Sequence, residues 1–97
     1  MRFITGTTDV ATAGTEQRIR NTAERVLSAS FKGRPANIGN VFIGFDTTIT
    51  STNGWTLAPG NTLAIDFAVL GGSVLANTFY VDAATNGDDV DWILVIA

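Results

Sequence analysis

Apolar and polar residues alternate along much of this chain, with the period of two that is typical of β-strands with one buried face. The clearest run is residues 62–70, TLAIDFAVL, in which every second residue is large and apolar. Residues 25–32 alternate in the same way. The last run, residues 90–97, is apolar at nearly every position. That pattern predicts a central strand covered on both faces.

Glycine, proline and asparagine separate these runs at short intervals. Pro59-Gly60 fits the two central positions of a type II turn, because proline fixes φ and glycine accepts the positive φ that follows. Asn53-Gly54 predicts a second turn, in which positive φ is again easily adopted. This second turn would end a short, threonine-rich strand around Ile49.

The segment 17–31 is the one place where a helix competes with strands, because some of its apolar residues fall on a helical stripe. The alternation within it favours two strands instead, at residues 17–21 and 25–32. Further short strands are expected at residues 40–45, 55–57 and 79–82. Many short strands with regular turns predict an all-β fold, either an antiparallel β-sandwich or a small jelly-roll-like barrel.

The length of 97 residues leaves room for one domain. Residues 16–97 are expected to form a single β domain. Residues 1–15 are rich in Thr, Gly and Ala, with Phe3-Ile4 as their large apolar pair. This segment is predicted to be an N-terminal arm or an edge strand.

Charge is sparse and unevenly distributed. Charged residues make up 15% of the chain and hydrophobic residues 45%, which favours assembly with a partner that covers surface. Residues 1–34 hold six basic and three acidic residues, a net of +3, whereas residues 35–97 hold six aspartates and no basic residue, a net of −6. The opposite charges either pair within the fold or dock a basic part on an acidic neighbour. A net of +3 is too weak to predict nucleic acid binding.

The chain has no cysteine and no histidine, which removes the commonest nucleophile–base pairs and metal ligands. The aspartates lie mostly at predicted turns, where they are common for structural reasons. The acidic stretch from Asp82 to Asp91 fails as a calcium loop, because Ile93 stands where a glutamate ligand is needed. A weak surface calcium at Asp88, Asp89 and Asp91 is the alternative to a plain acidic turn. We therefore expect no enzyme activity, no cofactor and no metal site. No signal peptide or membrane-spanning run is recognisable, so we expect synthesis in the cytoplasm and no membrane partner.

Four groups of residues follow one another in an order that resembles small virion proteins of tailed bacteriophages, of the capsid cement or decoration type. The shared positions are Asn37, Gly39, Val41, Phe42, Ile43 and Gly44; Ser51, Gly54, Leu57, Pro59 and Gly60; Phe79, Tyr80, Val81, Asp82 and Ala83; and Gly87, Asp88 and Val90. The match covers roughly the last three-quarters of the chain and consists mostly of turn formers and core positions.

The resemblance implies a β-sandwich or jelly-roll-like domain on the exterior of the virion capsid, made in the host cytoplasm and often present as a homotrimer. Its partners would be the major capsid protein and further copies of itself, and its work would be to tie neighbouring capsomers together. We expect the docking and subunit contacts at Arg2, Phe3, Ile4, Arg18, Arg20 and Trp55. The alternative is a phage fibre or tail β-domain that binds host surface glycan through Trp55, since sugars stack on exposed aromatic rings.

Overall fold

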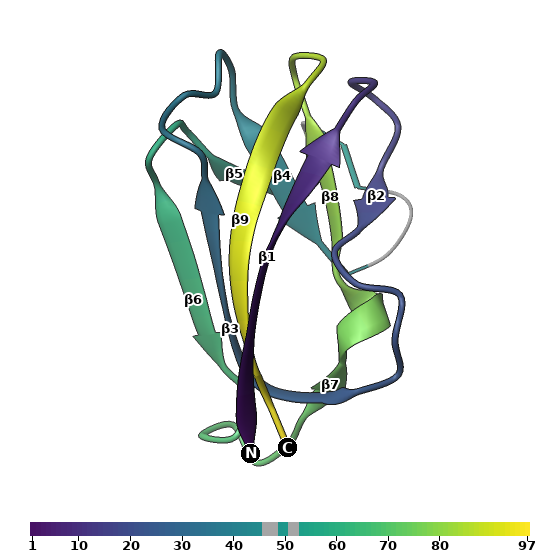
Figure 1. Cartoon of the computed structure of the whole chain (residues 1–97), viewed down its shortest axis with the longest axis vertical. Coiled ribbons are helices and arrows are strands. Elements are labelled where there is room, and N and C mark those ends of the chain that lie inside the picture. Colours follow the sequence, from purple (N-terminus) through teal and green to yellow (C-terminus); the bar gives the residue numbers. More distant parts are fainter. Residues whose placement is uncertain (46–48, 51–52) are drawn as a thin grey trace.

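The computed structural model describes residues 1–45, 49–50 and 53–97, and this part of the chain forms nine strands in two antiparallel sheets (Figure 1). Sheet A contains, in spatial order, β1 (Arg2–Val10), β9 (Asp88–Ile96), β3 (Arg25–Gly33) and β6 (Thr62–Asp66), with β7 (Val74–Leu75) also paired to β3. Sheet B contains β2 (Gln17–Arg18), β8 (Tyr80–Ala83), β4 (Val41–Gly44) and β5 (Trp55–Leu57). The prediction of an all-β sandwich is confirmed.

The two sheets pack face to face and bury one side of each strand between them. In β9 every second residue is buried, and its four core residues are Val90, Trp92, Leu94 and Ile96. Phe79, between η1 (the 3₁₀ turn Ala76–Thr78) and β8, is fully buried. Its ring lies 5.2 Å from Phe31 and 5.9 Å from Phe67, measured between ring centroids. These contacts join the two sheets at the centre of the molecule.

The two predicted turns have different outcomes. Gly60 has φ of 85°, and the amide of Asn61 donates to the carbonyl of Ala58 over 2.9 Å, as a type II turn at Pro59-Gly60 requires. The chain also turns at Asn53-Gly54, where the amide of Gly54 donates to the carbonyl of Thr50 over 3.0 Å, but Gly54 does not adopt the positive φ expected for it. A side chain is excluded there for another reason, because a Cβ would lie 2.8 Å from the Cβ of Phe42.

Three predicted strands differ in extent from those observed. The strand expected at residues 17–21 is only Gln17–Arg18, after which the backbone leaves sheet B. The strand expected at 62–70 ends at Asp66, because the chain turns there: the amide of Val69 donates to the Asp66 carboxylate over 3.2 Å, and the amide of Gly71 donates to the carbonyl of Ala68 over 3.0 Å. The threonine-rich strand is not seen at residues 49–50, and its other positions, 46–48 and 51–52, lie outside the described residues.

The segment 1–15 begins with a nine-residue strand. β1 pairs with β9 without interruption from Arg2 opposite Ile96 to Val10 opposite Asp88, and so forms one edge of sheet A. The N- and C-termini lie side by side as a result (Figure 1). Within the described residues, no helix has the length and hydrophobicity needed to cross a membrane.

Candidate functional site: the outer face of sheet A

Side chains that point away from the core form the outer face of sheet A. Residues paired across neighbouring strands point to the same side of the sheet, as Phe3 does with Val95 and Ser30 with Ile93. The face is made by Phe3, Thr5, Thr7 and Asp9 of β1; Asp89, Asp91, Ile93 and Val95 of β9; Ser28, Ser30 and Lys32 of β3; and Thr62, Ala64 and Asp66 of β6.

An apolar strip, formed by Phe3, Ile93 and Val95, runs along this face. The side chain of Phe3 is 72% exposed and that of Ile93 is 47% exposed. Their neighbours across the strands are small, namely Thr5, Ser28 and Ser30. The prediction that β9 is covered on both faces is therefore wrong for the isolated chain. Its inner face is buried by sheet B, but its outer face is open although the sequence there is apolar.

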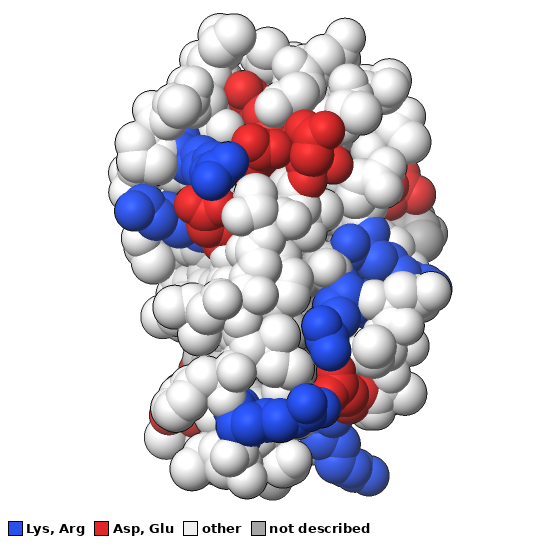
Figure 2. Space-filling model, in the orientation of Figure 1, with Lys and Arg blue, Asp and Glu red and all other residues white. Residues whose placement is uncertain are grey.

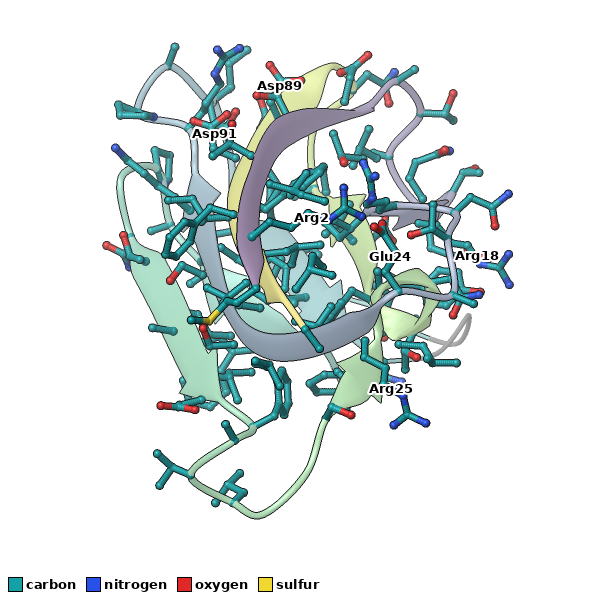
Figure 3. The ribbon with its side chains drawn as sticks, turned by 60° about the horizontal axis from the view of Figure 1, so that its bottom comes forward. Arg2, Arg18, Glu24, Arg25, Asp89 and Asp91 are labelled. Atoms are coloured by element: carbon teal, nitrogen blue, oxygen red, sulfur yellow. The ribbon has the colours of Figure 1, made fainter. Side chains whose placement is uncertain are left out.

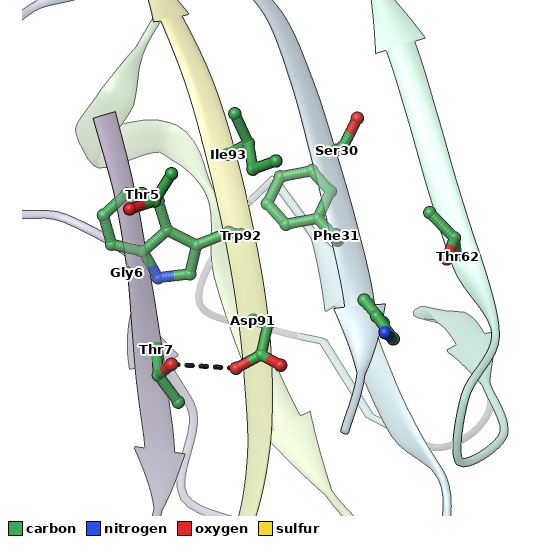
Figure 4. A pocket seen from close by; sticks show the side chains of 10 residues that line it. Thr5, Gly6, Thr7, Ser30, Phe31, Thr62, Asp91, Trp92 and Ile93 are labelled. Carbon is green, nitrogen blue, oxygen red and sulfur yellow. Dashed lines mark hydrogen bonds between the residues drawn. The ribbon is translucent and has the colours of Figure 1, made fainter. Parts of the chain in front are cut away.

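A depression of about 420 Å³ adjoins the strip (Figure 4). Gly6 has no side chain, and Trp92 and Phe31 turn theirs into the core, so the backbone of three strands forms the floor. The walls are the side chains of Thr5, Thr7, Ser30, Lys32, Thr62, Asp91 and Ile93. The hydroxyl of Thr7 donates to the Asp91 carboxylate over 2.8 Å. These groups supply hydrogen bonds and apolar contact, with one ammonium and one carboxylate, and therefore suit binding.

Carboxylates gather at the end of sheet A away from the termini (Figure 2). Asp9 lies directly opposite Asp89 in the β1–β9 pair. Desolvation, followed by a hydrogen bond with Asp89 and repulsion from its charge, raises the pKa of Asp9 above its usual value. Arg34 offsets part of this negative charge, since its guanidinium lies 3.3 Å from both the Asp89 and the Asp91 carboxylates.

Basic residues gather near the other end of β1, around Glu24 (Figure 3). The Nε of Arg20 donates to Glu24 over 2.7 Å, the hydroxyl of Thr22 donates over 2.8 Å, and Arg2 forms an ion pair with the second oxygen. The hydrogen bonds from Arg20 and Thr22 are the largest influences that lower the pKa of Glu24, and the positive charges of Arg20 and Arg2 add to them. Arg2 and Arg20 are thus engaged within the chain.

The six residues expected to dock do not lie on one surface. Phe3 belongs to the outer face of sheet A, whereas Ile4 points inward and packs against the core, which does not fit the docking role expected for it. Arg18 lies on sheet B, where its Nε donates to the Tyr80 hydroxyl over 2.7 Å and its guanidinium sits 5.4 Å from the ring centroid. Trp55 is on the edge strand β5 and is 62% exposed.

Sequence reasoning missed Ile93 and Val95 as surface residues. The signal was present, because both phases of the alternation in residues 90–97 are apolar. One phase fills the core, and the other would be buried only under a second cover. Periodicity alone does not say whether that cover comes from the same chain or from a partner.

The outer face of sheet B, in contrast, is covered by the chain's own loops. Phe42, Tyr80 and Asp82 point outward there, yet each is less than one-tenth exposed. The amide of Gly14 donates to Asp82 over 2.9 Å, which ties the loop after β1 to this face. Ile49 packs directly on Gly44, where a Cβ would lie 1.8 Å from the Ile49 Cγ2.

Three positions on which the expected resemblance rests, Asn37, Gly39 and Asp88, connect the loop before β4 to β9 at the end of the sandwich. The buried Asp88 carboxylate accepts hydrogen bonds from the amides of Ile38, over 3.0 Å, and Gly39, over 2.8 Å. The Asn37 amide group exchanges two hydrogen bonds with the backbone of Asp89. The side chains of Asp88 and Asn37 thus hold the loop before β4 onto the start of β9. In the described part of the chain, no group of three or more carboxylates is placed to hold a metal ion.

Comparison with known proteins adds little to this geometry. No family model matches the chain, and no curated protein matches it. Among solved structures, a chain from the disulfide-linked pili that form Bacillus endospore appendages is similar over 99% of this chain and 88% of its own length, with 16% sequence identity and a TM-score of 0.43. At this identity and TM-score the similarity carries no inference about function.

Proposed function

We propose that this protein is a structural component of a bacteriophage virion, a capsid cement protein that docks on the outer capsid through the outer face of sheet A. The main support is that the two sheets differ in how their outer faces are covered. The aromatic residues on the outer face of sheet B, Phe42 and Tyr80, are buried by the chain itself, whereas the apolar strip of sheet A is open to solvent. The resemblance of the sequence to cement and decoration proteins supports this choice of partner.

Burial of the strip would supply binding free energy. Phe3, Ile93 and Val95 lie on neighbouring strands, so one partner surface can cover all three. Full burial of side chains of this size contributes roughly 1.5–3 kcal/mol each. Part of Phe3 and Ile93 is already covered, and association costs entropy, so the net gain per subunit is smaller. A capsid offers many equivalent sites, which suits a module of modest affinity that bridges capsomers.

Capsid binding is best tested with point substitutions. Deletion of residues 1–15 would remove β1 and leave one side of β9 unpaired, so the deletion would damage the fold as well as the surface. The double variant Phe3→Thr/Ile93→Thr keeps strand-forming residues but removes most of the strip. Val69→Thr is the matched control, because Val69 is 80% exposed and lies in the loop after β6, outside the apolar strip.

The measurement is co-sedimentation with undecorated capsids of the parent phage. We expect the wild type and Val69→Thr to bind equally and the double variant to lose most of its occupancy, with all three proteins unfolding at similar temperatures. Equal occupancy of the double variant would contradict docking through sheet A. Failure of the wild type to bind would contradict the capsid proposal itself.

The second candidate is glycan binding by a fibre or tail domain, and the 62% exposure of Trp55 favours it. An open indole ring on an edge strand can stack on a sugar. A glycan array with wild type and Trp55→Ala tests this function. Support requires a hit that disappears in the variant, and an array without hits removes the proposal.

A further inference from the structure

β1 is the longest open edge in the described part of the molecule. The other strands at sheet edges are short: β6 has five residues, β5 three and β2 two. β1 has nine, with no proline and no lysine, and its register with β9 has no bulge. Proteins usually protect long edge strands with prolines, lysines or bulges, because an open edge is a template for pairing with another strand. The edge of β1 lacks them.

Hydrogen bonds at the far side of β9 show which residues of β1 face the open edge. Arg34 donates its amide to the carbonyl of Asp89, and Ala97 donates to the carbonyl of Arg25. Odd-numbered residues of β9 therefore bond towards β3, and even-numbered residues bond towards β1, since successive residues of a strand direct their amides to opposite sides. Even-numbered residues of β9 lie opposite even-numbered residues of β1.

It follows that Phe3, Thr5, Thr7 and Asp9 direct their backbone N–H and C=O groups to the open edge. In the described residues, no other segment hydrogen-bonds to these backbone groups. All four side chains are also exposed. The edge thus presents a row of free donors and acceptors that a second strand can satisfy.

The charge along this edge favours an antiparallel strand of the same sequence. At one end of β1, Arg2 and Arg20 both pair with Glu24 and leave a net positive charge, whereas at the other end Asp9 lies beside Asp89 (Figures 2 and 3). Antiparallel pairing sets the basic end of one copy beside the acidic end of the other. Parallel pairing would set like charges together.

We propose that β1 pairs antiparallel with β1 of a second copy, so that two A sheets join into one continuous sheet around a two-fold axis. Each copy then forms hydrogen bonds with the free backbone donors and acceptors at the edge of the other, as an isologous interface requires. The pair is a dimer, which differs from the homotrimer implied by the resemblance. The outer faces of both A sheets stay on the same side and remain free for docking. This pairing is tested without capsids, so its failure leaves the capsid proposal in place.

Amide hydrogen exchange, followed by NMR at low and high protein concentration, tests the pairing residue by residue. The amides of Ile4, Gly6 and Thr8 bond to β9 and should be protected at both concentrations. The amides of Thr5, Thr7 and Asp9 should exchange fast in the monomer and slowly in the dimer. A chain that stays monomeric at high concentration, or an associated form in which these odd-numbered amides still exchange fast, would overturn the proposal. In a separate sample bound to undecorated capsids, protection of the odd-numbered amides that is absent from the free protein would overturn self-pairing and assign the edge to the capsid protein.

Two substitutions sharpen the test. Thr5→Pro removes a backbone amide at the open edge but breaks no β1–β9 hydrogen bond. The two-fold axis doubles the number of lost intermolecular hydrogen bonds, so sedimentation should show dimerisation weakened by at least about tenfold. Thr5→Ala, the control, keeps the amide and should dimerise normally. Asp9→Lys should raise the unfolding temperature of the monomer, because it removes the repulsion from Asp89, and should weaken the dimer by placing a positive charge beside the partner's basic end. Unchanged dimerisation in Thr5→Pro, with β1–β9 protection intact, would contradict the pairing.

Discussion

The two outer faces of the sandwich carry similar chemistry but differ in what covers them. On sheet B, Phe42 is 5% exposed beneath the chain's own loops, whereas on sheet A, Phe3 is 72% exposed. Both are phenylalanines in strands, on the side of the sheet away from the core. The difference shows that an apolar residue on a strand does not by itself indicate a core position. The chain's own loops bury the phenylalanine on one sheet, whereas the phenylalanine on the other sheet is open to solvent.

The largest expected effect comes from exchanging these two phenylalanines for alanine. Phe42→Ala should cost about 3 kcal/mol of the free energy of unfolding, because it opens a cavity under the covering loops. Phe3→Ala should change that free energy by less than about 0.5 kcal/mol, since the ring is already in water. Urea unfolding of both variants measures the contrast. Similar losses in the two would show that the faces do not differ as described.

Gly44 is the position at which the cover of sheet B is most tightly fitted. A Cβ there would lie 1.8 Å from Ile49, so Gly44→Ala should displace the loop and cost about 2 kcal/mol. Gly72→Ala is the control, because Gly72 has open space around its Cα and no positive φ. Thermal unfolding compares the two, and an equal melting temperature would mean that Ile49 does not pack on β4.

The loop after β1 is fixed to sheet B by a carboxylate. Asp82 accepts amide hydrogen bonds from Gly14, over 2.9 Å, and from Ala83, over 2.8 Å. Asp82→Ala should cost about 1–2 kcal/mol and should raise hydrogen exchange at Gly14, because the donors are left without an acceptor. Asp66→Ala serves as the comparison, because Asp66 lies on the open face and should cost less. Unchanged hydrogen exchange at the Gly14 amide would show that Asp82 does not hold the loop after β1 on sheet B.

The smallest effects concern pH and the two ends of β1. Folding raises the pKa of Asp9, so protonated Asp9 stabilises the folded state below pH 3.8, its usual pKa. This stabilisation is lost as the pH rises through the raised pKa. The lowered pKa of Glu24 stabilises the fold above its usual value of 4.5, and this contribution is lost as the pH falls through the lowered pKa. Asp9→Asn should therefore raise the melting temperature of the monomer at neutral pH, and Glu24→Gln should lower it.

Both differences should vanish in strong acid, where the carboxyl groups are protonated in the folded and unfolded states alike. Thermal unfolding of dilute protein across this pH range checks them. A Glu24→Gln variant as stable as the wild type at neutral pH would show that the arginines around Glu24 do not stabilise the fold.

Local patterns in the sequence predicted the local structure well. The alternation of residues 25–32 specified a strand, and Pro59-Gly60 specified its turn, because both depend on neighbouring residues alone. The outward position of Ile93 could not be predicted, because it depends on which distant segments cover each face of β9. The need for glycine at position 54 could not be predicted either, because it comes from close contact with Phe42 and not from the φ of Gly54. The role of Asp88 was missed because its partners, Ile38 and Gly39, lie fifty positions away.

We propose that the outer face of sheet A is the face that docks on the capsid. Hydroxyl-radical labelling of the protein, free and bound to undecorated capsids, tests it most directly, because Phe3, Ile93 and Trp55 all react when exposed. We predict that binding protects Phe3 and Ile93 and leaves Trp55 labelled as in the free protein. Protection of Trp55, with Phe3 and Ile93 still fully labelled, would contradict the account.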